Sequence, residues 1–219
     1  MRHFLVIGLG RFGRAVAEGL TEAGAEVIGI DEDMNLVEAV RDRIAVAAQV
    51  DGVEPEALKA VGAAQADAAV VAIGEDFEAE VLTVAILKEL GIREIVARAQ
   101  DDRQRKILEL VGATRVLFVE KEMGHRLARA LAATHVTDHV NLGDGISLIY
   151  WTADDRVVGK TLAQTELRSR WGLHVVAVKR PRPNGEESVT VMPDASFTLL
   201  AGDVLLLVGA DARLKAFTK

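Results

Sequence analysis

"GLGRFGRAVAEGL", residues 8–20, follows the apolar run "HFLVI" (3–7) and opens with glycines at positions 8, 10 and 13. A G-x-G-x-x-G spacing between a predicted strand and a predicted helix is typical of a loop that binds nucleotide phosphates. Gly8 permits a tight turn, Gly10 lets a phosphate approach the backbone, and Gly13 lets helix and strand pack closely. Free N–H groups at the start of the helix would attract the anion.

Asp31 strengthens this interpretation. It ends the second apolar run, "EVIGID" (26–31), about 18 residues after Gly13, where a carboxylate can accept hydrogen bonds from ribose hydroxyls. The same negative charge disfavours a 2′-phosphate, so NADP is the least favoured dinucleotide. Three glycines in such a turn can also serve backbone geometry alone, but with Asp31 in place the sequence favours an adenine nucleotide.

Short runs rich in Val and Ile alternate with amphipathic stretches as far as residue 120. The runs predicted to be strands span residues 3–7, 26–31, 44–50, 68–74, 94–99 and 115–120. The stretches predicted to be helices, several ending in glycine, span residues 11–24, 34–42, 54–62, 77–91 and 102–112. Strict alternation predicts an α/β fold: a Rossmann-like, doubly wound parallel sheet.

The pattern changes after residue 120. Residues 120–136 predict one further helix, whose apolar face consists of Met123, Leu127, Ala130 and Leu131. Beyond it we predict strands and one short helix at residues 146–153, 161–170 (the helix), 172–180, 187–192 and 203–209, with a hairpin turn at Asn184-Gly185. The expected organisation is a Rossmann-like domain (1–120), a connecting or dimerisation helix (121–139) and a small α+β C-terminal subdomain (140–219).

Composition excludes several classes of protein. The 219 residues contain no cysteine, which rules out disulfides, thiolate metal sites and cysteine nucleophiles. A net charge of -7 opposes diffuse attraction to nucleic-acid phosphates, so a DNA-binding regulator is disfavoured. Since no apolar run approaches the roughly 18 to 20 residues of a membrane span, and no signal peptide is recognisable, we expect a cytoplasmic protein.

A dehydrogenase would need a substrate pocket with a general acid or base, usually on a sizeable second domain. The second segment here is small, and His174 lies inside the apolar run "GLHVVAV" (172–178), as a packed or edge-strand histidine would. His125, His135 and His139 show no tight metal-ligand spacing. The residues therefore favour a nucleotide held as a signal, with an NAD-dependent oxidoreductase as the alternative.

Further segments match one known family in order and spacing. They are "VVAIGEDFEAEVLTVAILKELGI" (70–92), "VARAQD" (96–101), "GATRVLFVEKEMG" (112–124), "VVGKTLAQTELRSRWGLHVVAVKR" (157–180) and "GDVLLLVG" (202–209). With the glycine loop and Asp31, the chain resembles, over essentially its whole length, a regulatory subunit of Trk/Ktr potassium uptake systems. Such subunits carry an RCK (KTN) domain followed by an RCK C-terminal subdomain.

The resemblance implies a protein that binds ATP, ADP or NAD(H) without consuming it. It also implies a homo-oligomer, typically an octameric ring, at the inner face of the plasma membrane beneath a cation-translocating partner. Exchange of the nucleotide would change the shape of the ring and so gate monovalent cation flux. The resemblance leaves open which nucleotide activates.

The resemblance also assigns residues to the nucleotide site. It places Arg11 and Phe12 of "GRFG" near the terminal phosphates, where the Arg11 guanidinium could report a γ-phosphate. It places Asp51 beside the adenine, although an aspartate there can also be a plain turn residue or helix cap. Ile73 and Gly74 match the turn that lines ribose and phosphates. Arg98 matches a basic position that faces the phosphates, with a solvated arginine as the alternative.

Glu120 matches a position where some relatives hold a divalent cation, Mg²⁺ or Ca²⁺, beside the γ-phosphate; a helix-start glutamate is the ordinary alternative. One departure from the family is Glu75-Asp76 after Gly74, because two carboxylates near phosphates would weaken an ATP complex unless a cation or Arg98 offsets them. In some relatives the C-terminal subdomain binds cyclic di-AMP. The basic stretch 179–185 could touch such a ligand, but a solvated hairpin is the favoured interpretation.

Overall fold

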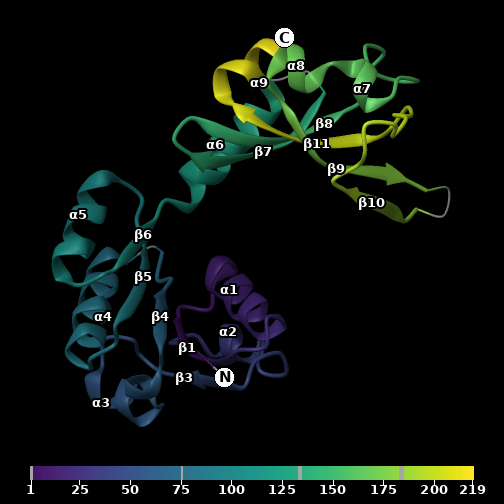
Figure 1. Ribbon diagram of the computed structural model, residues 1–219. Coiled ribbons are helices and arrows are strands. Elements are labelled where there is room, and N and C mark those ends of the chain that lie inside the picture. Colours follow the sequence, from purple (N-terminus) through teal and green to yellow (C-terminus); the bar gives the residue numbers. More distant parts are fainter. Residues whose placement is uncertain (1, 75, 133–134, 183–184) are drawn as a thin grey trace. The chain divides into compact units, whose positions relative to one another are not determined.

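The computed structural model describes residues 2–74, 76–132, 135–182 and 185–219. The chain forms two compact units, Met1–Glu120 and Lys121–Lys219, each with its own sheet and core (Figure 1). Within the described ranges, no helix combines the length and apolar character needed to cross a membrane.

The first unit is built on a six-stranded parallel sheet of order β3-β2-β1-β4-β5-β6. Its strands are β1 (His3–Ile7), β2 (Glu26–Asp31), β3 (Val46–Gln49), β4 (Ala68–Val71), β5 (Glu94–Arg98) and β6 (Arg115–Leu117). The strand order reverses between β1 and β4, and in such sheets the crevice at this switch point, outside the carboxyl ends of the strands, is where ligands bind. The predicted Rossmann-like α/β fold is confirmed.

Helices cover both faces of this sheet (Figure 1). They are α1 (Arg11–Glu22), α2 (Met34–Glu38), α3 (Pro55–Ala60), α4 (Phe77–Glu89), α5 (Asp102–Val111) and the short 3-10 helix η1 (Ala63–Gln65). Because successive strand residues point to opposite faces, Leu5 and Ile7 of β1 pack in the core beneath α3, α4 and α5, whereas Val6 packs with α1 and α2. Both faces are therefore buried, which explains the continuous apolar runs in the sequence.

Aspartate side chains begin three of these helices. Asp33, Asp76 and Asp101 are the N-caps of α2, α4 and α5, and each carboxylate accepts a hydrogen bond from a backbone N–H of the first turn. Capping satisfies donors that have no partner inside the helix. Helix α1 differs, because its N-cap is Gly10 and no side chain caps it.

The segment around residue 120 differs from the prediction. The sixth strand ends at Leu117 rather than at residue 120, and helix α6 runs from Val119 to Ala132. The predicted helix over 120–136 is too long, because the chain turns at His135, whose φ is 61°, and Val136 begins strand β7. Asp138 interrupts the alternating pattern of this largely polar strand, which depends on its pairing with β8. The side chain of Ala130 lies outside the described part of the chain.

The second unit holds a five-stranded antiparallel sheet of order β10-β9-β11-β8-β7. Its elements are β7 (Val136–Gly143), β8 (Ile146–Thr152), α7 (Leu162–Thr165), α8 (Leu167–Trp171), β9 (His174–Pro181), β10 (Glu187–Val191), β11 (Val204–Ala210) and α9 (Asp211–Phe217). The single helix predicted over 161–170 is interrupted by Glu166, whose φ of 53° is left-handed. The α+β character of the subdomain is confirmed, whereas strand β7 and helix α9 were not predicted.

Aromatic side chains form the centre of the second unit. Trp151 on β8 is fully buried, and its ring lies edge-on to Phe217 of α9 with 4.8 Å between centroids. Trp171 contacts the same phenylalanine at 5.4 Å. Strands β9 and β10 pair as an antiparallel hairpin, as predicted, although Asn184 of the expected turn lies outside the described residues.

Candidate functional site

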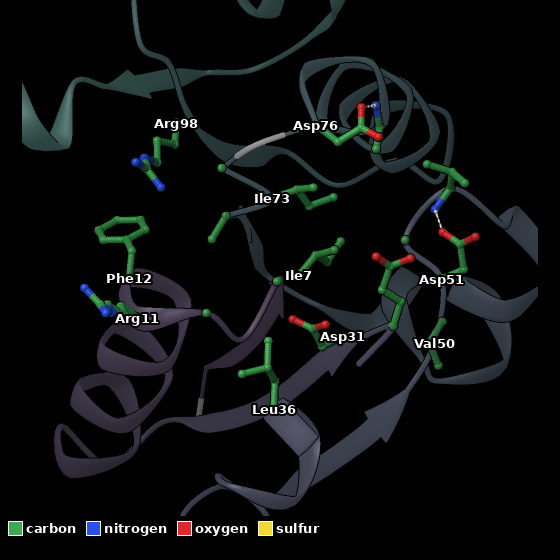
Figure 2. A pocket seen from close by; sticks show the side chains of 18 of the residues that line it. Ile7, Arg11, Phe12, Asp31, Leu36, Val50, Asp51, Ile73, Asp76 and Arg98 are labelled. Atoms are coloured by element: carbon green, nitrogen blue, oxygen red, sulfur yellow. Dashed lines mark hydrogen bonds between the residues drawn. The ribbon is translucent and has the colours of Figure 1, made fainter. Parts of the chain in front are cut away.

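A cavity of about 1130 Å³ opens at the carboxyl ends of the strands of the first unit (Figure 2). Ten of the eleven predicted site residues line it: Gly8, Gly10, Arg11, Phe12, Asp31, Asp51, Ile73, Gly74, Arg98 and Glu120. The eleventh, Gly13, is buried beneath the loop and supports it from behind.

The three glycines of the loop meet three different demands. Gly8 has a φ of +89°, and a Cβ there would lie 2.8 Å from the backbone of Ala72 on the neighbouring strand end. A Cβ on Gly13 would lie 1.7 Å from the carbonyl oxygen of Gly8. At Gly10 no described atom lies within 4 Å of the Cβ position, so this side of the loop is open toward the cavity.

Helix α1 starts at this open point. Its N-cap, Gly10, offers no side chain to the free N–H groups of the first turn. A twelve-residue helix carries a partial positive charge at such an end, and the N–H groups point toward an incoming anion. The loop and helix start together fit a pyrophosphate group.

Asp31 ties the glycine loop to the end of β2. Its Oδ2 accepts a hydrogen bond from Leu9 N at 2.6 Å, and its Oδ1 accepts one from Asp33 N at 2.9 Å. Each carboxylate oxygen has a further lone pair, and the side chain lines the cavity. Asp31 can therefore fix the loop and still accept hydrogen bonds from ribose hydroxyls.

The two ends of the cavity differ in character. Figure 2 shows Arg11, Phe12 and Arg98 gathered at one end, and Asp51 with Val50 at the other. Apolar side chains that line the cavity and were not predicted include Ile7, Leu36, Val50 and Val53. Ile7 ends β1 and Val50 follows β3, and this position at a strand end was a signal in the sequence that could have identified these two. An elongated ligand with anionic groups at one end and a flat apolar ring at the other fits this arrangement.

Asp51 combines both roles considered for it. Its Oδ1 accepts a hydrogen bond from Val53 N at 3.0 Å, as a turn residue does, and the exposed side chain also lines the cavity. It is close to the apolar end, where a carboxylate can accept a hydrogen bond from an amino group on a base.

The two arginines stand in different electrostatic environments. The side chain of Arg98 is 20% exposed, its Nη2 donates to Glu120 Oε1, and its buried Nε has no hydrogen-bond partner among the described residues. Arg11 is exposed and has no ion-pair partner among the described residues. Gln100 donates to Gly74 O at 3.0 Å and so holds the turn beside Arg98. Arg11 is thus the cation whose charge stands unopposed.

The predicted cation site rests on Glu120 alone in this single chain. Within the described residues, no three His, Asp or Glu side chains gather closely enough to hold a metal ion. Asp76 also lines the cavity, but its Oδ1 accepts a hydrogen bond from Ala79 N as the cap of α4. Glu75, the other carboxylate noted beside Gly74, lies outside the described residues. The metal role of Glu120 stays a prediction.

Glu80 was not predicted from the sequence. It lies in the first turn of α4, is 3% exposed, and accepts a hydrogen bond from Arg98 N at 2.9 Å. Burial raises its pKa to about 7, although the hydrogen bond and the charge of Arg98 lower it. Its place in an apparently ordinary helix turn gave no signal, because only the packing of α4 on the sheet buries it.

We expect Glu80→Gln to change the pH dependence of stability. A folded-state pKa near 7, above the 4.5 of an ordinary glutamate, means that the folded chain binds the extra proton between these values. Stability from this group is therefore present at low pH and is lost as pH rises toward 7, by about 1.4 kcal/mol per pH unit. Urea unfolding at pH 5, 6, 7 and 8 measures the free energy of both proteins. The free energy of unfolding of Glu80→Gln minus that of the wild type should grow up to pH 7 and then level off.

A matched control for this experiment is Glu89→Gln, an exposed glutamate in the last turn of the same helix. The difference in the free energy of unfolding between Glu89→Gln and the wild type should stay constant over the same pH range. Parallel stability curves for Glu80→Gln and wild type would contradict the assignment.

Most of the described basic side chains in the stretch 179–185 form ion pairs within the second unit. Arg180 donates from Nε and Nη2 to the fully buried Asp203, both at 2.7 Å, and this hydrogen bonding raises the pKa of Arg180 above its usual value. Lys179 lies 3.6 Å from Glu187. Arg182 is exposed. Two of these three cations are therefore paired within the hairpin and its neighbours.

Comparison with known proteins agrees with this architecture. A family model described as the TrkA-N domain matches residues 4–119, and one described as the TrkA-C domain matches residues 148–219. The chain is 35% identical over 218 residues to the Ktr system potassium uptake protein C of Bacillus subtilis (strain 168), covering 100% of this chain and 96% of that protein. It is 32% identical over 213 residues to the Ktr system potassium uptake protein A of Vibrio alginolyticus, covering 97% and 94%.

Among solved structures, the GsuK channel bound to NAD matches with a TM-score of 0.54 and 23% identity. The match covers 99% of this chain and 38% of the channel chain, and it supports the fold. The two family models and the full-length similarity to the Ktr proteins show that the chain belongs to the TrkA/Ktr family of potassium uptake proteins.

Proposed function

We propose that this chain is a nucleotide-sensing regulatory subunit that controls a membrane potassium-translocating partner. The observation that carries the proposal is the cavity itself: a glycine-rich loop at the start of a helix, the carboxylate of Asp31 and a group of apolar side chains surround one space. Arg11 and Arg98 stand at the phosphate end. ATP, ADP and NAD(H) share the adenylate portion that such a cavity would take.

The lining supports a signal rather than a reaction. Among the described residues around the cavity there is no His, Lys, Tyr, Ser, Thr or Cys, and the carboxylates of Asp31, Asp51 and Asp76 already accept hydrogen bonds from backbone N–H groups. We therefore propose binding without turnover. An NAD-dependent oxidoreductase stays the alternative, and hydride transfer to or from a 2-hydroxy acid or a sugar phosphate would establish it.

The same proposal includes a membrane partner and a homo-oligomer. The relatives from Bacillus subtilis and Vibrio alginolyticus are named potassium uptake proteins, although no helix described in this chain could itself span a membrane. The chain would therefore act from the cytoplasmic side, through a partner that forms the ion path. On α6, Met123, Leu127 and Leu131 are 56%, 60% and 77% exposed, which is an apolar stripe suited to a second copy in an octameric ring.

We expect Arg11→Ala to weaken ATP binding selectively. A charge-assisted hydrogen bond to the γ-phosphate is worth about 1.5–3 kcal/mol, so ATP affinity should fall roughly 10- to 100-fold, whereas ADP affinity changes little. Calorimetric titration of the purified chain with ATP, ADP, NAD and NADH, with and without Mg²⁺ or Ca²⁺, measures both effects. The same titrations with cyclic di-AMP test the C-terminal subdomain.

Arg14→Ala is the control, because Arg14 is an exposed arginine of the same helix that does not line the cavity. It should leave every affinity unchanged. Equal losses for ATP and ADP in Arg11→Ala would refute γ-phosphate sensing. Wild-type protein that binds no adenine nucleotide would refute the proposed function as a whole.

A further inference from the structure

Helix α4 contacts both ends of the cavity through two buried polar side chains. Thr83 Oγ1 donates a hydrogen bond to Gly52 O at 3.1 Å, and Glu80 Oε1 accepts one from Arg98 N at 2.9 Å. Thr83 is completely buried and Glu80 is 3% exposed. Residues three apart lie on the same side of a helix, so one stripe of α4 holds two separate backbone segments.

These two backbone segments carry the two ends of the site. Gly52 directly follows Asp51 at the apolar end, and Arg98 belongs to the phosphate end. Neither Thr83 nor Glu80 lines the cavity itself. Their hydrogen bonds therefore act from behind the wall, and the helix fixes how far apart the two ends are.

We propose that Thr83 and Glu80 are positioning residues for the nucleotide site: Thr83 sets the base end, and Glu80 couples its own protonation to phosphate binding at Arg98. The inference rests on the proposed function, because it concerns the same cavity. It assigns to α4 a role that the glycine loop and the cavity-lining side chains do not cover.

The coupling follows from the charges around Glu80. From β5, Arg98 is the charged group that acts on the Glu80 carboxyl, and the guanidinium of Arg98 in turn faces Glu120. On α4 itself, the neighbouring carboxylates Asp76 and Glu78 are exposed. A phosphate at Arg98 adds negative charge near Glu80 and favours its protonated form. Binding should therefore favour proton uptake at Glu80, and this coupling should strengthen binding more at pH 6 than at pH 8.

The test compares ADP with adenosine, which has no phosphate, by calorimetry of the full chain at pH 6, 7 and 8. Glu80→Gln keeps an acceptor oxygen and cannot ionise. The ratio of ADP affinities, variant over wild type, should rise about fivefold to tenfold between pH 6 and pH 8. The titration of ADP itself is common to both proteins and cancels in the ratio. For adenosine the ratio should stay constant, as it should for both ligands in Glu89→Gln.

Thr83 is tested by its effect on the base end. Thr83→Val removes the hydroxyl at nearly constant volume. It should lower the affinities for adenosine and ADP by the same factor, about fivefold, as expected for one buried hydrogen bond. Thr83→Ser keeps the hydroxyl and should restore both affinities. A loss of general packing would instead weaken binding in both variants.

A pH-independent ADP ratio in Glu80→Gln, or equal weakening by Thr83→Val and Thr83→Ser, would overturn the inference while leaving the proposed function standing. If Glu80→Gln does not fold, the wild type alone decides. Calorimetry in two buffers of different ionisation enthalpy at pH 8, where the phosphates of ADP are fully ionised, should then detect net proton uptake on ADP binding, and net release or no exchange would overturn the coupling. Absence of nucleotide binding by the wild type at every pH would instead refute the proposed function.

Discussion

Gly13→Ala is expected to abolish nucleotide binding and to destabilise the first unit by about 3 kcal/mol or more. The added Cβ would lie 1.7 Å from the carbonyl oxygen of Gly8, so α1 and the loop cannot keep their present distance. Backbone atoms on both sides of this contact leave no flexible side chain to move aside. Calorimetric titration with adenine nucleotides and urea unfolding measure the two losses.

Gly19→Ala provides the comparison, because Gly19 lies in the same helix, is exposed, and has no described atom within 4 Å of its Cβ position. Alanine is the better helix former, so this change should stabilise the chain by up to about 1 kcal/mol. Nucleotide affinity should stay at the wild-type value. A Gly13→Ala protein with normal stability and affinity would show that the loop geometry described here is wrong.

Asp31→Asn is expected to lower nucleotide affinity roughly 10- to 100-fold, the range for loss of a charge-assisted hydrogen bond. The carboxylate accepts from Leu9 N and Asp33 N on its two oxygens. An asparagine offers only one oxygen, so its amide N–H₂ must face a backbone N–H donor. The loop therefore loses a tether, and the ribose loses its anionic acceptor. Affinities for ATP, ADP and NAD should fall by similar factors, because all three contain the adenosine ribose.

Asp67→Asn is a chemically matched control at the amino ends of the strands, where Asp67 precedes β4. Asp67 Oδ2 accepts a hydrogen bond from His3 N at 2.8 Å, and the residue does not line the cavity. The change removes the same kind of carboxylate-to-backbone contact, so a similar small loss of stability is expected with unchanged nucleotide affinity. Equal affinity losses in Asp31→Asn and Asp67→Asn would mean that Asp31 acts on stability alone.

Most of the first unit could be predicted because its signals are local. The alternation of short apolar runs with amphipathic stretches specified six strands and the helices between them, and ten of eleven predicted site residues meet at one cavity. Gly8 needs a left-handed φ of +89°, a demand that glycine meets within a single residue. Parallel strands place their carboxyl ends on one side of the sheet. Asp31 and Asp51, which end or follow neighbouring strands, therefore lie near the same cavity.

The boundary between the units could not be predicted in the same way. In the sequence "VTDHVNLG" (136–143), Asp138 interrupts the alternation of apolar and polar residues, and the extended form depends on hydrogen bonds to β8. Helix α6 ends earlier than its alanine-rich sequence suggests, because the chain turns at His135 to reach that strand.

The sequence by itself determined the parallel sheet, the position of the glycine loop and the carboxylate at the end of β2, since each depends on residue type and short-range spacing. Only the tertiary structure decided that Arg98 pairs with Glu120, that Glu80 is buried beneath Arg98, and that Thr83 holds Gly52, 31 residues away. The physical reason is that burial and charge pairing depend on which distant segments pack together. The local sequence around a polar residue in a helix does not indicate whether the fold exposes that residue to water or buries it against a strand.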